Sequence, residues 1–268
     1  MPQIKLIATD IDGTLVSNQG IITERSLRAI RAAREKGITV AISTGRFPEN
    51  AYLLLEDYGL RLPIIGVNGA RCVDENLHEL SSHEMDPEAV RRVLNVLLTA
   101  EADFFIFADH AVCAATRERK HHSELSQGDR VKALGFEYYH GREDVEACIR
   151  RPVYKFFVCD NVPLPPLRQV LARIPGVDLT QSWYNNIEIM PAGVDKGQGV
   201  RDMARVMGIS TDEVMTLGDQ SNDIPMLKAA GYGVAMGNAS EETKAAARFV
   251  TASYAEEGFA LALETYAL

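Results

Sequence analysis

Two acidic segments near opposite ends of the sequence carry the residues best suited to chemistry. The first is Asp10–Thr14, with the sequence DIDGT, and the second is Gly218–Asp223, with the sequence GDQSND. Each closes a short apolar run, and together they supply enough carboxylates to surround one cation. A carboxylate can attack phosphorus as a nucleophile, and a hard cation can neutralise phosphoryl oxygens. The two segments therefore indicate phosphoryl transfer.

The spacing of Asp10 and Asp12 suits a joint role. The pair follows an apolar run typical of a buried strand, and alternation along an extended chain directs both side chains to the same side. Gly13 then permits a sharp turn, and the Thr14 hydroxyl can bond to nearby backbone. Acidic pairs usually form solvated loops, but this position at a strand end favours a functional site.

The second acidic segment has two carboxylates four residues apart, in a loop that opens a predicted helix. An acidic residue in a first helical turn complements the helix dipole, which is a sufficient explanation for Asp223. Asp219 instead ends an apolar strand, as Asp10 does. This pattern favours a metal-binding role for Asp219, because carboxylate oxygens are ligands that hard cations prefer.

Two further segments offer groups that could bind phosphate. Ser43–Arg46 follows a second predicted strand and could present a hydroxyl and backbone N–H groups at a helix N-terminus, although a plain helix cap explains it equally well. Lys196 opens another predicted helix, where the positive end of the dipole disfavours a cation. A bound anion would offset that cost, while a solvated surface lysine is the commoner explanation for a single Lys.

The elements that would position these residues alternate between strand and helix. The pattern predicts strands over Ile4–Thr9, Ile38–Ser43, Pro63–Val67, Glu213–Leu217 and Tyr232–Met236. It predicts helices over Thr23–Lys36, Pro48–Tyr58, Lys196–Met207 and Asp223–Ala230. Such alternation indicates an α/β fold with a parallel sheet, and ligands of these sheets bind at the carboxyl ends of the strands.

The middle of the sequence has a different pattern, with short strands and few helices. Neither flank would form a complete α/β sheet alone. We therefore predict a Rossmann-like core made from residues 1–84 and 187–268, interrupted by an inserted α+β cap at residues 85–186. Trp183–Asn186, close to the return to the core, is a candidate recognition loop, although packing explains an aromatic pair there more simply.

Composition narrows the class of protein. The 268-residue chain has a net charge of −9 and no block of Lys and Arg, which argues against nucleic acid or an anionic membrane as a partner. Its four cysteines are scattered without a C-x-x-C pair, which argues against a zinc site and for a reducing compartment. No apolar run approaches the roughly 18 residues of a membrane span, and the N-terminus leads straight into a strand pattern. We expect a cytoplasmic monomer or small homo-oligomer.

Taken together, the motifs resemble the haloacid dehalogenase superfamily, and within it the Cof-type hydrolases with a large α/β cap. The resemblance runs from about residue 4 to about residue 260 and rests on DIDGTL at 10–15, STGR at 43–46, NG at 68–69, DKG at 195–197 and GDQSND at 218–223. It implies a Mg²⁺-dependent phosphomonoesterase with an aspartyl-phosphate intermediate. Its substrate would be a small phosphorylated metabolite such as a sugar phosphate. One departure is Tyr254, which stands where the family's late loop has Asn.

The resemblance also implies a role for each motif residue. Asp10 would be the nucleophile, and Asp12 the general acid and then the base that activates water. Mg²⁺ would be held by Asp10, by the backbone carbonyl of Asp12 and by Asp219, with Asp223 supporting these ligands from behind.

The remaining motif residues would bind the substrate. The groups expected around the phosphoryl group are the backbone N–H groups of Ile11 and Gly45 and the side chains of Thr44, Lys196 and Asn222. Arg46 and Asn68 would contact the substrate at the rim of the site, and the resemblance implies that the cap sets substrate specificity.

Two alternatives remain open from the sequence. A sugar phosphomutase of the same superfamily would share the aspartyl phosphate and return the phosphoryl group to sugar. A metabolite-binding regulatory protein would keep the fold with an inactive site, but the intact Asp10, Asp12, Lys196 and Asp219 favour an enzyme.

Overall fold

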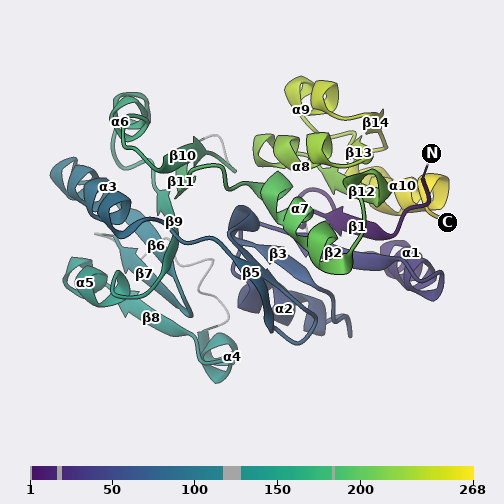
Figure 1. Ribbon diagram of the computed structural model, residues 1–268, viewed down its shortest axis with the longest axis horizontal. Helices are drawn as coiled ribbons and strands as arrows, with labels where there is room; N and C mark the ends of the chain where they lie inside the picture. The colour runs from purple at the N-terminus through teal and green to yellow at the C-terminus, as the bar shows by residue number, and fades with distance from the viewer. Residues whose placement is uncertain (1, 17–19, 117–127, 183–184) are drawn as a thin grey trace. The chain divides into compact units, whose positions relative to one another are not determined.

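The computed structural model describes residues 2–16, 20–116, 128–182 and 185–268. The chain divides into two compact units, drawn in Figure 1. The first contains Met1–Ser81 and Asp195–Leu268, and the second contains Ser82–Val194. The candidate recognition residues Trp183 and Tyr184 lie outside the described residues.

The first unit is built on an eight-stranded sheet. Its strands are, in spatial order, β14 (Phe249–Val250), β13 (Tyr232–Ala235), β12 (Val214–Gly218), β1 (Leu6–Thr9), β2 (Thr39–Ser43), β3 (Ile64–Gly66), β4 (Arg71–Val73) and β5 (Glu79–Ser82). Neighbours from β14 to β3 are parallel, and β4 turns back antiparallel to β3. Because β1 pairs with β12 on one side and β2 on the other, the two flanks of the insertion form one sheet.

Helices cover both faces of this sheet (Figure 1). They are α1 (Glu24–Glu35), α2 (Pro48–Glu56), α7 (Lys196–Met207), α8 (Ile224–Ala229), α9 (Glu241–Ala246) and α10 (Gly258–Tyr266). Alternation along β1 supplies both apolar layers: Ile7 packs with α1, α2 and α10, whereas Leu6 and Ala8 pack with α7 and α8. The predicted Rossmann-like α/β core is thus confirmed.

Local sequence signals set the helix boundaries. The Thr23 side chain caps α1 by accepting a hydrogen bond from the backbone N–H of Ser26, and α1 buries Leu27, Ile30 and Ala33 on one side. Asp195 caps α7 in the same way, through the N–H of Gln198. Short 3₁₀ turns also occur at Val67–Gly69, Thr211–Glu213, Ser221–Asp223 and Tyr254–Glu256.

The second unit is an α+β module with a six-stranded sheet. Its spatial order is β10 (Val177–Thr180), β11 (Ile187–Pro191), β9 (Val153–Val158), β6 (Phe104–Ala108), β7 (Ala111–Ala115) and β8 (Glu137–His140). Its helices are α3 (Pro87–Thr99), α4 (Gly128–Ala133), α5 (Val145–Cys148) and α6 (Leu164–Leu171), and a 3₁₀ turn spans Arg142–Asp144. Apolar residues of β6 and β9 share one buried cluster with α3 and α6.

The return from the insertion differs from the sequence-based boundary at residue 187. β11 pairs antiparallel with both β9 and β10, and Ile187 and Ile189 are buried in the core of the second unit. These side chains need the partner sheet for their burial, so the chain enters the first unit only at Asp195.

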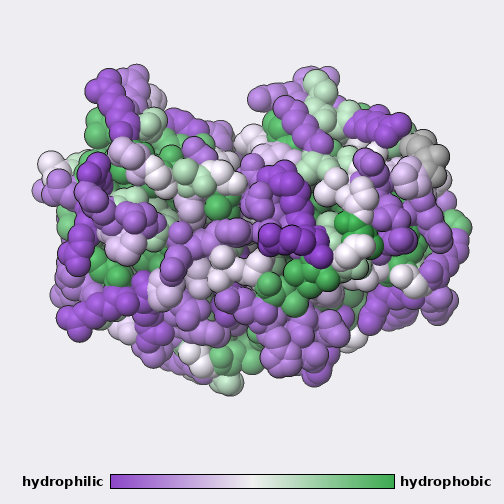
Figure 2. Space-filling view, viewed as in Figure 1, coloured by the Kyte–Doolittle hydropathy of each residue, from purple (hydrophilic) through white to green (hydrophobic). Residues whose placement is uncertain are grey.

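The surface is consistent with the composition. On the face drawn in Figure 2, hydrophilic residues predominate and hydrophobic residues form small separate patches. Among the described residues, no helix has the length and apolar character needed to span a membrane.

Candidate active site

The candidate site lies at the carboxyl edge of the sheet in the first unit. Asp10 follows β1, Thr44 follows β2, and Asp219 follows β12, and these three strands are adjacent and parallel. Residues more than 200 positions apart in sequence are therefore neighbours, as the Thr14–Asp219 hydrogen bond illustrates. This edge is where α/β sheets of this kind bind their ligands.

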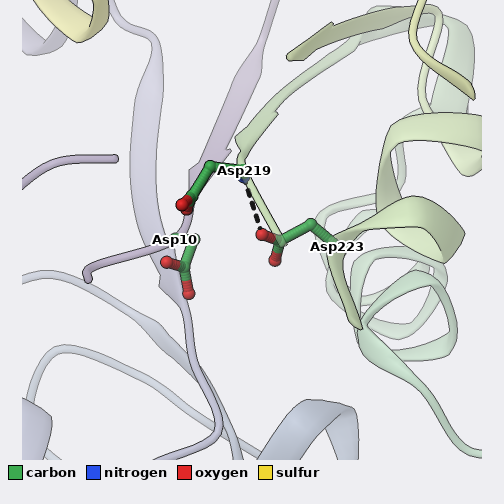
Figure 3. A group of neighbouring side chains, drawn as sticks. All are labelled: Asp10, Asp219 and Asp223. Atoms are coloured by element: carbon green, nitrogen blue, oxygen red, sulfur yellow. Dashed lines mark hydrogen bonds between the residues drawn. The ribbon is translucent and has the colours of Figure 1, made fainter. Parts of the chain in front are cut away.

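Three buried carboxylates form a compact cluster there. Asp10, Asp219 and Asp223 each offer an oxygen within 4.8 Å of the others, as Figure 3 shows. Such a set of oxygen donors fits a hard divalent cation. Asp10 and Asp219 come from adjacent strands, whereas Asp223 reaches the cluster from the start of the segment that leads into α8.

Lys196 is buried inside this cluster. Its Nζ donates hydrogen bonds of 2.6 Å to Asp10 Oδ1 and 2.6 Å to Asp223 Oδ1. Burial acts to lower the pKa of the ammonium group, but the two carboxylates outweigh it and raise the pKa overall. Lys196 is therefore a charged group of the site, and the explanation as a solvated surface lysine is wrong because its side chain is about 1% exposed.

Two of the buried carboxyl groups, Asp10 and Asp219, have raised pKa values. Burial raises the pKa of Asp10 well above its ordinary value, against the opposing attraction of Lys196. Burial also raises the pKa of Asp219 to about 6, and repulsion from Asp223 adds to this effect. Both groups would gain from a nearby cation, which favours their ionised forms.

Three side chains hold the Asp219 carboxylate in place. The Thr14 hydroxyl donates to Oδ1 at 3.0 Å, while the side-chain amides of Gln220 and Asn238 donate to Oδ2 at 3.1 and 3.2 Å. Gly13 allows this close approach, because a Cβ atom at Gly13 would lie 2.5 Å from Asp219 Oδ2. The sequence analysis did not single out Asn238. Its available signal was a polar residue just beyond β13, at the same sheet edge.

Asp223 fixes the loop that carries Asp219. Its Oδ2 accepts hydrogen bonds of 2.9 Å from the backbone N–H groups of both Asp219 and Gln220, and its Oδ1 accepts from Lys196. Figure 3 shows the bond to the Asp219 backbone. Asp223 therefore links Lys196 to the backbone of the loop that carries Asp219.

Asp12 has a different environment from Asp10. Its side chain is 62% exposed and forms an ion pair with Arg46, whose Nη2 lies 2.8 Å from Asp12 Oδ1 and whose Nε lies 3.1 Å from Oδ2. The two carboxylates of the DIDGT segment thus differ in environment: Asp10 is buried among charged groups, and Asp12 is open to solvent.

The segment after β3 contacts both the segment after β2 and the acidic loop Gly218–Asp223, because Asn68 bonds to Thr44 and to Asn222. Thr44 is buried, and its hydroxyl accepts from the Arg46 N–H at 3.2 Å. The cap position of α2 is Phe47, so Thr44 is not a plain helix cap. Asn222 Nδ2 donates to Asn68 Oδ1 at 3.3 Å.

The two remaining sequence-predicted residues lie beside these groups. Gly45 connects Thr44 to Arg46. The Ile11 side chain is buried in the apolar core, so only its backbone can contribute to the site.

Comparison with known proteins identifies the family. Residues 7–263 match the sequence model of the haloacid dehalogenase-like hydrolases. The chain belongs to this family. The predicted superfamily membership is thereby confirmed, and the match covers both the sheet unit and the inserted unit of the hydrolase.

Several named relatives of this hydrolase are phosphatases. The 5-amino-6-(5-phospho-D-ribitylamino)uracil phosphatase YwtE of Bacillus subtilis is 31% identical, over 96% of this chain and 96% of its own. The HMP-PP phosphatase of Serratia proteamaculans is 27% identical, over 90% of this chain and 86% of its own. A solved haloacid dehalogenase subclass IIB sugar phosphatase is 27% identical with a TM-score of 0.80, and the match covers 98% of each chain. The predicted enzyme class, a phosphatase of phosphoric monoesters, is confirmed.

Proposed function

We propose that this hydrolase is a Mg²⁺-dependent phosphomonoesterase that forms an aspartyl phosphate on Asp10. The observation that carries the proposal is the buried Asp10 carboxylate, held by Lys196 and adjacent to Asp219 and Asp223. A lysine contact of 2.6 Å on Oδ1 fixes the orientation of the carboxylate, which a nucleophile aimed at phosphorus requires.

Charge balance supports a divalent cation. Three buried carboxylates face one buried ammonium group, so the ionised cluster carries two uncompensated negative charges. Burial raises the pKa values of Asp10 and Asp219, and repulsion among the carboxylates adds to the effect. Mg²⁺ fits the all-oxygen donor set and would be held by Asp10, the Asp12 backbone carbonyl and Asp219. When bound, it would neutralise charge on the phosphoryl oxygens.

The chain's own residues account for the two chemical steps. An Asp10 oxygen forms a bond to phosphorus as the bond to the leaving alcohol breaks, and Asp12 supplies the proton that the alcohol takes up. Water then attacks the aspartyl phosphate and gives a proton to Asp12, which releases inorganic phosphate and restores Asp10. The exposed side chain of Asp12 can exchange protons with solvent.

The transferring phosphoryl group needs donors around it. In our proposal these are Lys196, the Thr44 hydroxyl, the Asn222 amide and the backbone N–H groups of Ile11 and Gly45. The Asn222–Asn68 contact supports this assignment, because it brings the β3 loop next to the acidic loop. Arg46 and Asn68 would then meet the rest of the substrate.

The substrate in this proposal is a small phosphorylated metabolite such as a sugar phosphate. The phosphatases similar to this chain act on compounds of that size, among them a phosphorylated ribitylaminouracil and sugar phosphates. The inserted unit, Ser82–Val194, would set specificity. We further propose a cytoplasmic monomer or small homo-oligomer that binds neither nucleic acid nor membranes, in keeping with the net charge of −9.

The test is a screen of phosphorylated metabolites with Mg²⁺ that follows released phosphate and isomerised sugar phosphate separately. We expect phosphate release, and predominant isomerisation would instead identify a phosphomutase. Asp10→Asn should abolish turnover and remove the phosphoryl adduct from the peptide that contains residue 10, as measured by mass spectrometry. Asp212→Asn, at an exposed carboxylate of the same unit, is the matched control. Full activity of Asp10→Asn would refute the nucleophile assignment.

A further inference from the structure

Asn238 connects three segments of the site that are distant in sequence. It lies in the loop between β13 and α9 and is exposed. Its Nδ2 donates to Asp219 Oδ2 at 3.2 Å and to the Gly13 carbonyl at 3.0 Å. Its Oδ1 accepts the backbone N–H of Tyr254 at 3.0 Å. The amide thus uses both of its N–H groups and its oxygen, a combination that carboxylate or hydroxyl side chains do not offer.

We propose that Asn238 is a positioning residue that orients Asp219 for the cation and ties that orientation to the late loop Ser253–Gly258. The inference rests on the proposed Mg²⁺ function. Among the described residues, the Asn238 side chain donates to Asp219 Oδ2 together with the side chain of Gln220. Groups that orient metal ligands in this way commonly change metal affinity by about 10- to 100-fold when they are removed.

The backbone on both sides of Asn238 supports a positioning role. The Met236 N–H donates to the Gly218 carbonyl at 3.0 Å, immediately before Asp219 in the chain. The Gly237 N–H donates to the Ala252 carbonyl at 3.0 Å, immediately before the late loop. Asn238 is therefore anchored between the strand end that carries Asp219 and the loop that carries Tyr254.

The late loop acts on Asn238 through its backbone. A capping box orders the loop: Ser253 Oγ donates to Glu256 Oε2 at 2.7 Å, and the same oxygen accepts the Ser253 N–H at 3.3 Å. This turn fixes the position of the Tyr254 backbone N–H, which donates a hydrogen bond to Asn238 Oδ1. The contact does not depend on the side chain at position 254, which explains how Tyr can replace the Asn of the family pattern without loss of this contact.

The test measures Mg²⁺ affinity of the full chain by isothermal titration calorimetry. Asn238→Ala should raise the Kd about tenfold. Tyr254→Pro should do the same, because it removes the N–H donor while proline is tolerated at the first position of a helical turn. Tyr254→Asn keeps the N–H and should change the Kd less than about twofold. Asn76→Ala, in an exposed turn between β4 and β5, is the matched control and should leave the Kd unchanged.

The outcomes separate this inference from the function on which it rests. If the wild-type chain binds Mg²⁺ and Asn238→Ala binds it equally well, the positioning role is wrong. If Tyr254→Asn weakens binding as much as Tyr254→Pro, the side chain at 254 matters and the backbone link is wrong. Absence of Mg²⁺ binding by the wild-type chain would overturn the metal assignment and this inference with it. Circular dichroism of each metal-free variant checks that the fold is retained.

Discussion

Lowering the pH should weaken Mg²⁺ binding through Asp219. Burial raises the pKa of this carboxyl from its ordinary value of 3.8 to about 6. A metal ligand must be ionised, so a proton competes with the cation for Asp219. With a pKa of about 6, the apparent Kd should be about 11-fold higher at about pH 5 than at about pH 8, and about twofold higher at about pH 6. The raised pKa of Asp10 acts in the same direction, so the effect from Asp219 alone is a lower bound.

The stability of the metal-free chain should follow the opposite trend. Between the unfolded pKa of 3.8 and the folded pKa of about 6, the folded chain binds more protons at Asp219 than the unfolded chain does. This contribution to the free energy of unfolding therefore falls as the pH rises through that window, by up to about 3 kcal/mol. The full cost is present above about pH 6 and is absent below the unfolded pKa.

Two measurements on wild type and Asp219→Asn check this reasoning. Isothermal titration calorimetry gives the Mg²⁺ Kd across the pH range, and urea unfolding with a chelator, followed by circular dichroism, gives the free energy of unfolding. Because other carboxyl groups also titrate, the informative quantity is the difference in stability between wild type and Asp219→Asn. A Kd that is the same at about pH 5 and about pH 8, or a stability difference that does not change with pH, would refute the role assigned to Asp219.

Three further substitutions test other parts of the site. Lys196→Met leaves two buried carboxylates without their cation and should lower the free energy of unfolding by about 3 to 5 kcal/mol in urea titrations; a loss below about 1 kcal/mol would contradict the buried ion pairs. Gly13→Ala places a Cβ 2.5 Å from Asp219 Oδ2 at a residue with φ of +87°, so it should weaken Mg²⁺ binding in calorimetry, and unaltered affinity would contradict the close packing. Asp12→Asn should reduce kcat by about 10²- to 10⁴-fold, while Mg²⁺ affinity stays within about twofold because only the backbone of Asp12 would bind the cation; an equal loss of both would contradict a purely acid–base role.

The strands and helices that carry the motifs could be predicted from sequence because each has a local signal. Buried parallel strands are continuous apolar runs, and α1 and α7 have side-chain caps at Thr23 and Asp195. The boundary of the insertion could not be placed in this way. β11 is short, mostly apolar and buried, as the core strands are, and only its pairing with β9 and β10 assigns it to the second unit.

The active site likewise has features that local sequence predicts and features that depend on tertiary contacts. The sequence indicated that Asp10 and Asp219 each end a strand of a parallel sheet, and such strands share a carboxyl edge. The pairing of β1 with β12 in the structure makes the two strands neighbours. The state of Lys196 could not be predicted, since a lysine at a helix start is usually solvated. Its burial depends on Asp10, 186 positions away, and on Asp223, 27 positions away.

Local sequence patterns were enough to identify the chemical groups, the strands they follow and the family to which the chain belongs. The folded structure was needed to show which carboxylates share one charge cluster, which one is exposed beside Arg46, and that Asn238 holds Asp219. The physical reason is that motifs report local backbone patterns, whereas ionisation and orientation depend on burial and on hydrogen-bond partners. Those partners come from segments that meet only when the sheet is assembled.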